Sequence, residues 1–259
     1  MDPAYGLLLV GGGARQPPAD CAAVAAAARA EHWWQTASFG RFRPRARLLP
    51  PVMLGVDPAG WCAGGGLGAG PRNAAGLVRA ALSSLPPGTA CPDAVVMVVD
   101  APVAPHAWRV ADGGVPVAPG QWVRRYAALP GGATLGAWTH ELAHLLLRWP
   151  DLPGSACLMG GGAHRGNGWD PAPPNPSLAL AAGWLTLVPA DPTLPASALG
   201  PTKAMALDWR CRALLVTCEG AEFWIHDRLR PGPALATGRV ADPGLPLLNG
   251  IAAALAGLA

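Results

Sequence analysis

The sequence predicts an α/β protein: a twisted mixed sheet with covering helices in an N-terminal subdomain, followed by a smaller, β-rich C-terminal subdomain. The run AspAlaValValMetValValAsp (93–100) is rich in β-branched residues and almost wholly apolar, which is typical of a strand covered on both faces. Helical patterns precede and follow that strand, whereas about the last seventy residues read as short strands. We therefore expect two subdomains, residues 1–150 and 151–259.

The elements before the central strand follow from local patterns. Residues 5–10 form a short apolar run and predict a buried strand. Asp20 follows two prolines and is expected to cap the alanine-rich helix 21–34. Apolar positions interrupted by prolines predict two short strands within residues 40–56. Apolar residues on one stripe predict a second helix over residues 73–85.

Two elements and a long connection come after the central strand. GlnTrpValArgArgTyr (121–126) predicts a further strand near an edge of the sheet. A helix that carries the candidate active site is expected from about Thr134 to Trp149, because Pro150 cannot continue it. Residues 150–175 are rich in glycine, proline and asparagine and predict a long loop. A loop of that length inside a compact domain is usually functional or disordered.

The C-terminal subdomain begins after the active-site helix and contains a short helix of its own. Asn175 is expected to cap this helix, Pro176 to occupy its first position and Gly183 to end it. Residues 211–217 and 222–228 predict a β-hairpin, and an Ala/Leu helix is expected to close the chain.

The composition narrows the classes of protein. Apolar residues make up 51% of the chain and charged residues 14%, as in a globular protein. The net charge of +3 does not favour a nucleic-acid or membrane partner, and the arginines of RFRPRAR (41–47) are interpreted as a solvated strand face. No secretory signal opens the chain and no apolar stretch is long enough to span a membrane. A cytoplasmic protein is expected, or a secreted one if a propeptide has been trimmed.

The six cysteines contain no CxxC pair, which argues against a structural zinc cluster. Cys211 and Cys218 flank the predicted hairpin and could form a disulfide across it. Buried free thiols are the equal alternative for a protein that stays inside the cell.

The chemistry concentrates in HisGluLeuAlaHis (140–144). His140 and His144 are four residues apart on a predicted helix, so their imidazoles project from one face and can share a metal ion. Glu141 lies one position round the helix, where its carboxylate can reach a metal-bound water without being a ligand. The alternative interpretation is an amphipathic helix whose histidines are satisfied by hydrogen bonds.

A third metal ligand is expected just beyond this helix. Asp151 follows His144 by seven residues, where the returning chain can offer an oxygen ligand. His164 is the alternative third ligand, and Asp170 or water are further ones. Without a metal role, Asp151 is a turn former and His164 a solvated loop residue. The sequence neither supports nor excludes calcium in the loop 166–170.

These segments together resemble the immune-inhibitor-A-like zinc metallopeptidases, a metzincin-related family. Besides residues 140–144, the matching segments in family order are ProAspLeu (150–152), LeuMetGly (158–160), AsnProSerLeu (175–178) and AlaGlyTrpLeu (182–185). Weaker similarities extend the resemblance over about residues 33–230. The resemblance implies a zincin fold, one Zn²⁺ ion and a Met-turn in which Met159 lies beneath the metal.

The chain departs from the family pattern at three places. Leu147 stands where the family has a glycine that lets the chain turn after the helix, and Pro153 stands where it has a tyrosine. One extra residue moves the aspartate from the sixth to the seventh position after the second histidine. Within the same resemblance, His106 is expected near the cleft as a substrate or oxyanion contact, with a structural role as the alternative.

We therefore expect a zinc metallopeptidase that hydrolyses peptide bonds in a peptide or protein substrate. His140, His144 and Asp151 would hold one Zn²⁺ ion, a metal-activated water would attack the scissile carbonyl, and Glu141 would act as the general base. Two alternatives stay open. One is a dedicated intracellular peptide-processing enzyme or amide hydrolase of the same fold. The other is a non-catalytic zinc-binding relative that binds peptides.

Overall fold

The computed structural model describes residues 2–61, 71–110, 113–153 and 155–184, together with four strands beyond them. Those strands are β9 (Thr186–Val188), β10 (Lys203–Asp208), β11 (Ala213–Cys218) and β12 (Ala221–Trp224). Among the described residues, no helix is both long enough and apolar enough to cross a membrane.

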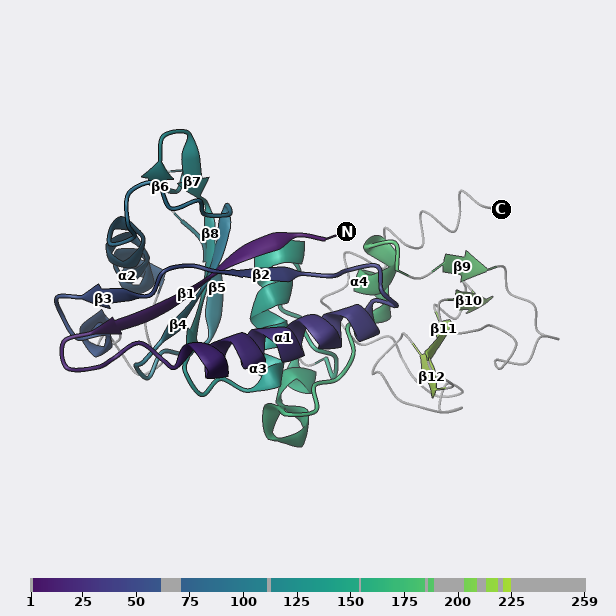
Figure 1. Ribbon diagram of the computed structural model, residues 1–259. Helices are drawn as coiled ribbons and strands as arrows, with labels where there is room; N and C mark the ends of the chain where they lie inside the picture. The colour runs from purple at the N-terminus through teal and green to yellow at the C-terminus, as the bar shows by residue number, and fades with distance from the viewer. Residues whose placement is uncertain are drawn as a thin grey trace.

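The main sheet has six strands of mixed direction (Figure 1). Its path runs β2-β1-β4-β8-β5, and β3 pairs with the end of β1. All of these pairings are parallel except that of β8 with β5, which is antiparallel and leaves β5 at the edge. The strands are β1 (Ala4–Gly12), β2 (Arg45–Leu48), β3 (Val52–Leu54), β4 (Ala94–Val99), β5 (His106–Arg109) and β8 (Arg125–Pro130). The α/β class with a mixed sheet is thus as predicted.

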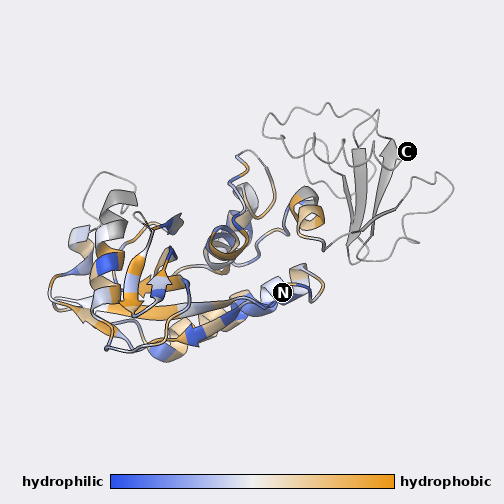
Figure 2. Cartoon of the chain, turned by 90° about the horizontal axis from the view of Figure 1, so that it is seen from above, coloured by the Kyte–Doolittle hydropathy of each residue, from blue (hydrophilic) through white to orange (hydrophobic). Residues whose placement is uncertain are grey.

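Helices cover both faces of this sheet, because alternate side chains of each strand point to opposite sides. On one face, Leu7 and Val96 belong to the apolar layer beneath α1 (Asp20–Ala37) and α3 (Leu135–Leu142). On the other face, Leu8 and Met97 belong to the layer beneath α2 (Pro71–Ser83). Figure 2 shows the apolar central strands between the more polar outer surfaces. All six residues of β4 are buried, so the predicted central strand is confirmed.

Two predictions about this part of the chain are wrong. The segment 121–126 is not one strand near an edge: it comprises β7 (Gln121–Val123), which pairs with β6 (Val115–Ala118) in a separate hairpin, and the start of the interior strand β8. Asp20 is the first residue of α1 rather than its cap, since Ala19 holds the cap position without a side-chain hydrogen bond. A carboxylate in the first turn still favours the helix dipole.

The predicted helix 134–149 consists of two elements. Thr134 caps α3 by accepting a hydrogen bond from the Ala137 amide over 3.3 Å. The helix then passes into a π-helical turn, η2 (Ala143–Leu147), and Arg148 follows in the left-handed conformation with a φ of 59°. A π-helical turn holds more residues than an α-helical one, so it accommodates the extra residue before Asp151. The chain reverses at Arg148 and not at Leu147.

Backbone contacts give the predicted loop 150–175 a definite shape. The Leu152 amide donates to the Met159 carbonyl over 2.7 Å, and the Gly160 amide donates to the Cys157 carbonyl over 3.0 Å. The 3-10 turns of η3 (Gly161–Gly168) follow, interrupted by a kink. The short helix α4 (Pro176–Ala181) begins at its proline as predicted, and Gly183 follows it with a φ of 72°.

The predicted hairpin is present in the C-terminal part. Strands β11 and β12 pair antiparallel within a four-stranded sheet of order β12-β11-β10-β9. The predicted closing helix and the cysteine pair 211 and 218 lie outside the residues whose structure and side chains are described. Cys21, Cys91 and Cys157 are free thiols.

The first turn of α3 has no room for a side chain at Gly136, where η3 packs against it. A Cβ atom on Gly136 would lie 1.8 Å from the carbonyl oxygen of Ala163 and 3.3 Å from that of Gly168. Both obstacles are backbone atoms, which cannot move without shifting η3 itself. The close approach of η3 to the helix that carries the histidines therefore depends on a glycine at this position.

We expect Gly136→Ala to lower the free energy of unfolding by about 2 kcal/mol or more, because the added methyl group overpacks a backbone contact. Gly132→Ala is the matched control, since a Cβ atom on Gly132 would meet nothing within 4 Å. Urea unfolding of both variants measures the difference. Equal midpoints for the two variants would contradict the assigned role of Gly136.

Candidate metal centre

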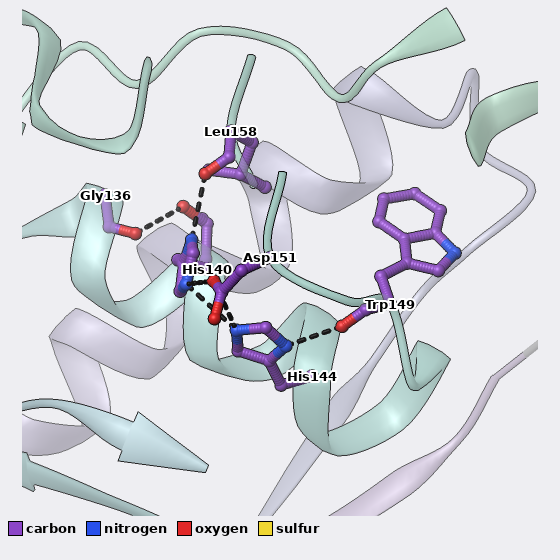
Figure 3. Close-up of polar contacts among 7 residues, drawn as sticks. Gly136, His140, His144, Trp149, Asp151 and Leu158 are labelled. Carbon is purple, nitrogen blue, oxygen red and sulfur yellow. Dashed lines mark hydrogen bonds and ion pairs between the residues drawn. The ribbon is translucent and has the colours of Figure 1, made fainter. Parts of the chain in front are cut away.

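The structure brings the side chains of His140, His144 and Asp151 together (Figure 3). The Nε2 atoms of the two histidines are 2.9 Å apart. The Oδ1 atom of Asp151 lies 3.1 Å from Nε2 of His140 and 3.2 Å from Nε2 of His144. Helix α3 and the turn η2 supply the two imidazoles, and the chain that returns after Arg148 supplies the carboxylate.

Backbone carbonyls orient both imidazoles from behind. Nδ1 of His140 lies 2.9 Å from the Leu158 carbonyl oxygen, and Nδ1 of His144 lies 2.5 Å from the Trp149 carbonyl oxygen. A carbonyl oxygen can only accept, so each Nδ1 carries the proton of its neutral ring. Each Nε2 is then left with an exposed lone pair, and the two lone pairs face the Asp151 oxygen.

Three electron-rich atoms that converge in this way repel one another unless a cation lies between them. A proton shared between the rings would be the other remedy. Burial lowers the pKa of His140, although the Leu158 carbonyl and the Asp151 charge oppose that effect. The charged imidazole is therefore disfavoured at this position, and the three atoms form a group that could hold a metal ion.

The spacing of the three atoms suits a small tetrahedral ion. Ligands at about 2.0–2.1 Å from a tetrahedral zinc ion are about 3.3–3.4 Å from one another. The observed separations of 2.9 to 3.2 Å are shorter by a few tenths of an ångström. Two imidazole nitrogens and one carboxylate oxygen are a ligand set typical of zinc, whereas calcium prefers oxygen ligands alone.

An aromatic cluster holds the carbonyl that orients His144. The ring of Trp149 lies 5.1 Å from that of Trp184 and 5.7 Å from that of Trp34, and Trp149 is 8% exposed. The pair with Trp34 is edge to face and the pair with Trp184 is tilted, and aromatic contacts at such distances stabilise the segment beyond their buried area. The Trp149 carbonyl is therefore fixed from the core side.

The turn that contains Met159 holds the carbonyl that orients His140. Cys157, Leu158 and Met159 are fully buried and belong to the same apolar layer as α3. A Cβ atom on Gly160 would lie 2.4 Å from the Ser155 carbonyl oxygen, so the turn is too tight for a larger residue. Met159 thus lies in a compact turn that carries the Leu158 carbonyl to His140.

Glu141 lies between the two histidines in sequence and is only 5% exposed. Its Oε2 atom has no hydrogen-bond partner among the described residues. Burial and, to a smaller extent, the charge of Asp151 raise the pKa of this carboxyl to about 8. A bound cation would oppose that shift. A buried carboxyl group without a partner is rare in folded proteins and is typical of a general base or acid.

The other predicted site residues lie elsewhere. His164 is exposed in η3, and Asp170 pairs its carboxylate with Arg165 over 2.9 Å. His106 pairs in register with Ala128 and lies 5.6 Å from the ring of Tyr126, on the α2 face of the sheet. Because α3 covers the opposite face, the structure places His106 away from the metal ligands. Its Nδ1 contacts the Ala104 carbonyl over 2.8 Å, which fits the structural alternative.

Three groups around this centre were not found from the sequence: the Leu158 and Trp149 carbonyls and the side chain of Arg125, which donates to the Leu145 carbonyl. Every residue has a carbonyl, so no residue type marks the ones that orient a histidine. The sole signal in the sequence is indirect, namely that two metal-binding histidines require acceptors for their Nδ1 protons.

Comparison of the chain with protein-family models and with curated proteins gives no match. The function of the site is therefore inferred from its geometry and chemistry.

Ionisation of Glu141 should lower the free energy of unfolding of the metal-free protein as the pH rises. The carboxyl binds a proton more tightly when folded, with a pKa of about 8, than when unfolded, with a pKa near the model-peptide value of about 4.3. Its contribution is therefore favourable below the unfolded value and is lost as the pH rises toward 8. Because glutamine does not titrate, metal-free Glu141→Gln should gain stability relative to the parent protein between about pH 5 and pH 8, by up to about 1.4 kcal/mol per pH unit.

Chemical denaturation of both metal-free proteins across that pH range measures the difference. Titratable groups distant from Glu141 contribute equally to both proteins and cancel in the comparison. A difference in stability that stays constant with pH would contradict the burial of an ionisable carboxyl at this position.

Proposed function

We propose that this chain is a zinc-dependent metallopeptidase with a metzincin-related zincin fold. The observation that carries the proposal is the convergence of two Nε2 lone pairs and the Asp151 oxygen beside the buried, unpartnered carboxylate of Glu141. An amphipathic helix with structural histidines has no need to aim its imidazoles at each other. It also has no need to bury a carboxyl group without a partner.

Two features of the fold support the same proposal. The histidines are carried by a helix that packs on a mixed α/β sheet, and a buried turn with Met159 contributes the carbonyl that orients His140. The family resemblance implies both a histidine-bearing helix and a methionine turn beneath the metal. The turn also follows Asp151 at the place in the chain that the resemblance requires.

A zinc ion in this centre would polarise the scissile carbonyl and lower the pKa of water to about 7. The carboxylate of Glu141 accepts the proton of the attacking water and then donates it to the leaving amine nitrogen, as base and then acid. Its low exposure keeps bulk water from competing for that proton. His140 and His144 keep their Nδ1 protons on backbone carbonyls, so they orient the centre and transfer no proton.

A peptide substrate is favoured by the edge strand β5, which contacts the η2 turn that carries His144. Among the described strands, β5 pairs only with β8 and is therefore an edge strand. An extended peptide can pair with such an edge and so be aligned beside the metal centre. A small amide substrate would leave this edge unused.

One observation favours the non-catalytic alternative. Pro153 occupies the position of the family tyrosine. The chain has two tyrosines, and neither takes the place of that missing residue. The Tyr5 hydroxyl donates to Glu31, and Tyr126 lies on the α2 face of the sheet. A peptide-binding relative would need no such phenol. It would also have no use for the buried carboxylate of Glu141, which is why we place hydrolysis first.

We expect the purified protein to bind one equivalent of zinc and to cleave a casein-type substrate. Glu141→Gln should keep the zinc and lose about 10²- to 10⁴-fold in rate, because it removes only the general base. His144→Ala should lose the zinc itself. His164→Ala is the matched control: its imidazole is exposed and outside the ligand group, so both zinc and activity should be retained. Metal analysis and proteolysis assays on the four proteins test this.

The alternatives correspond to distinct results. Zinc binding without casein cleavage, with a native substrate that Glu141→Gln fails to process, would identify the dedicated processing enzyme. Zinc binding with a native peptide that both proteins bind and neither cleaves would identify the non-catalytic relative. A parent protein that binds no zinc would overturn the proposal.

A further inference from the structure

The side chain of Arg125 connects the central sheet to the turn that carries His144. Arg125 is the first residue of β8, and its Nη1 atom donates to the Leu145 carbonyl over 2.6 Å. Ala127 and Leu129 follow at two-residue spacing in the apolar layer beneath α3. The guanidinium group therefore lies on the same face of the sheet as the metal centre.

Asp93 fixes the other side of this guanidinium. The Nη2 atom of Arg125 donates to both carboxylate oxygens of Asp93, over 3.0 Å and 2.9 Å. The Asp93 carbonyl also accepts from the backbone amides of Arg124 and Arg125. Arg125 is thus held at its backbone and at its side-chain tip, and its side chain is only 18% exposed. This pair is held by more hydrogen bonds than a single-contact surface ion pair.

The segment that receives this contact needs external support. The last carbonyls of a helix have no partner within the helix, and Leu145 lies in that last turn. The turn is π-helical, a rare conformation, and it ends at Arg148 with a positive φ of 59°. Neither feature is stable on its own, yet His144 must keep its Nε2 atom aimed at one point.

We propose that the Asp93–Arg125 ion pair is a tether that positions the His144 turn for metal binding. The Leu145 carbonyl lies in the peptide bond that follows the residue after His144. Anchoring this carbonyl therefore restricts the backbone that sets the direction of the His144 imidazole. A cation at a helix C-terminus is also favourable for the helix dipole. The carboxylate of Asp93 neutralises the guanidinium, so the tether does not repel a divalent ion in the neighbouring centre. Arg125 and Asp93 are positioning residues, and they contact no metal ligand directly. The inference rests on the proposed metal centre but not on peptide hydrolysis.

Arg125→Met tests this tether, because methionine keeps an unbranched apolar stem and removes all of the donors. We expect the zinc affinity of this variant, measured by competition with a chromophoric chelator, to fall about tenfold to a hundredfold, as for other residues that orient ligands from behind. Its cobalt-substituted form should show a changed visible absorption spectrum, which reports ligand geometry. In the metal-free variant, amide hydrogen exchange of residues 143–149 should become faster.

Two further variants make the test specific. Asp93→Asn keeps the guanidinium but weakens its contacts with residue 93. It should therefore change zinc affinity, the cobalt spectrum and the exchange of residues 143–149 in the same direction as Arg125→Met, by smaller amounts. Arg15→Met removes another arginine of an ion pair, the one with Asp57 at 3.2 Å, which touches no residue of the metal centre. Arg15→Met should leave zinc affinity, cobalt spectrum and the exchange of residues 143–149 as in the parent protein.

A folded Arg125→Met variant with the parent zinc affinity and cobalt spectrum would overturn the tether. If Arg125→Met does not fold, the same readouts on Asp93→Asn decide. A parent protein that binds neither zinc nor cobalt would defeat the proposed function instead. The tether would then be judged by hydrogen exchange alone, and an unchanged exchange of residues 143–149 would overturn it.

Discussion

Two hydrogen bonds from imidazole Nδ1 atoms to backbone carbonyls determine the character of the site. They hold the protons of His140 and His144 on the outer nitrogens and leave the inner Nε2 atoms as bare acceptors 2.9 Å apart. With Asp151 added, three electron-rich atoms converge in one small space that could hold a metal ion. Much of the surrounding structure serves these two carbonyls: a tight buried turn carries that of Leu158, and a cluster of tryptophans carries that of Trp149.

The sheet supplies the rigid base against which this arrangement is built. Parallel strands with both faces buried present one apolar layer to α1 and α3 and another to α2. The helical segment of α3 and η2 is held by different contacts: η3 packs against Gly136 at the start of α3, and Arg125 binds the Leu145 carbonyl in η2. The two histidines of the candidate centre therefore lie on a helical segment that is held at both ends, as a site of defined geometry requires.

Solvent exposure rises across the site from Glu141 through the two histidines to Asp151. Glu141 is 5% exposed, the side chains of His140 and His144 are 15% and 19% exposed, and that of Asp151 is 66% exposed. Under the proposed function, a base kept from bulk water would lie beside a metal ligand that faces solvent, as hydrolysis requires. Among the described strands β5 lies at the sheet edge and contacts the same turn, where the proposed peptide substrate could align.

The sequence alone determined those features that depend on periodicity. The four-residue spacing of His140 and His144 places both imidazoles on one face of any helix, and the β-branched run 93–100 predicts a strand covered on both faces. Tertiary structure alone decided which ring nitrogens face inward, that Asp151 rather than His164 approaches them, and which sheet face carries His106. These outcomes depend on backbone carbonyls and strand pairings between distant parts of the chain. Such contacts leave no mark in the residue types, because every residue has the same carbonyl and a one-residue shift in strand register reverses the face of every side chain.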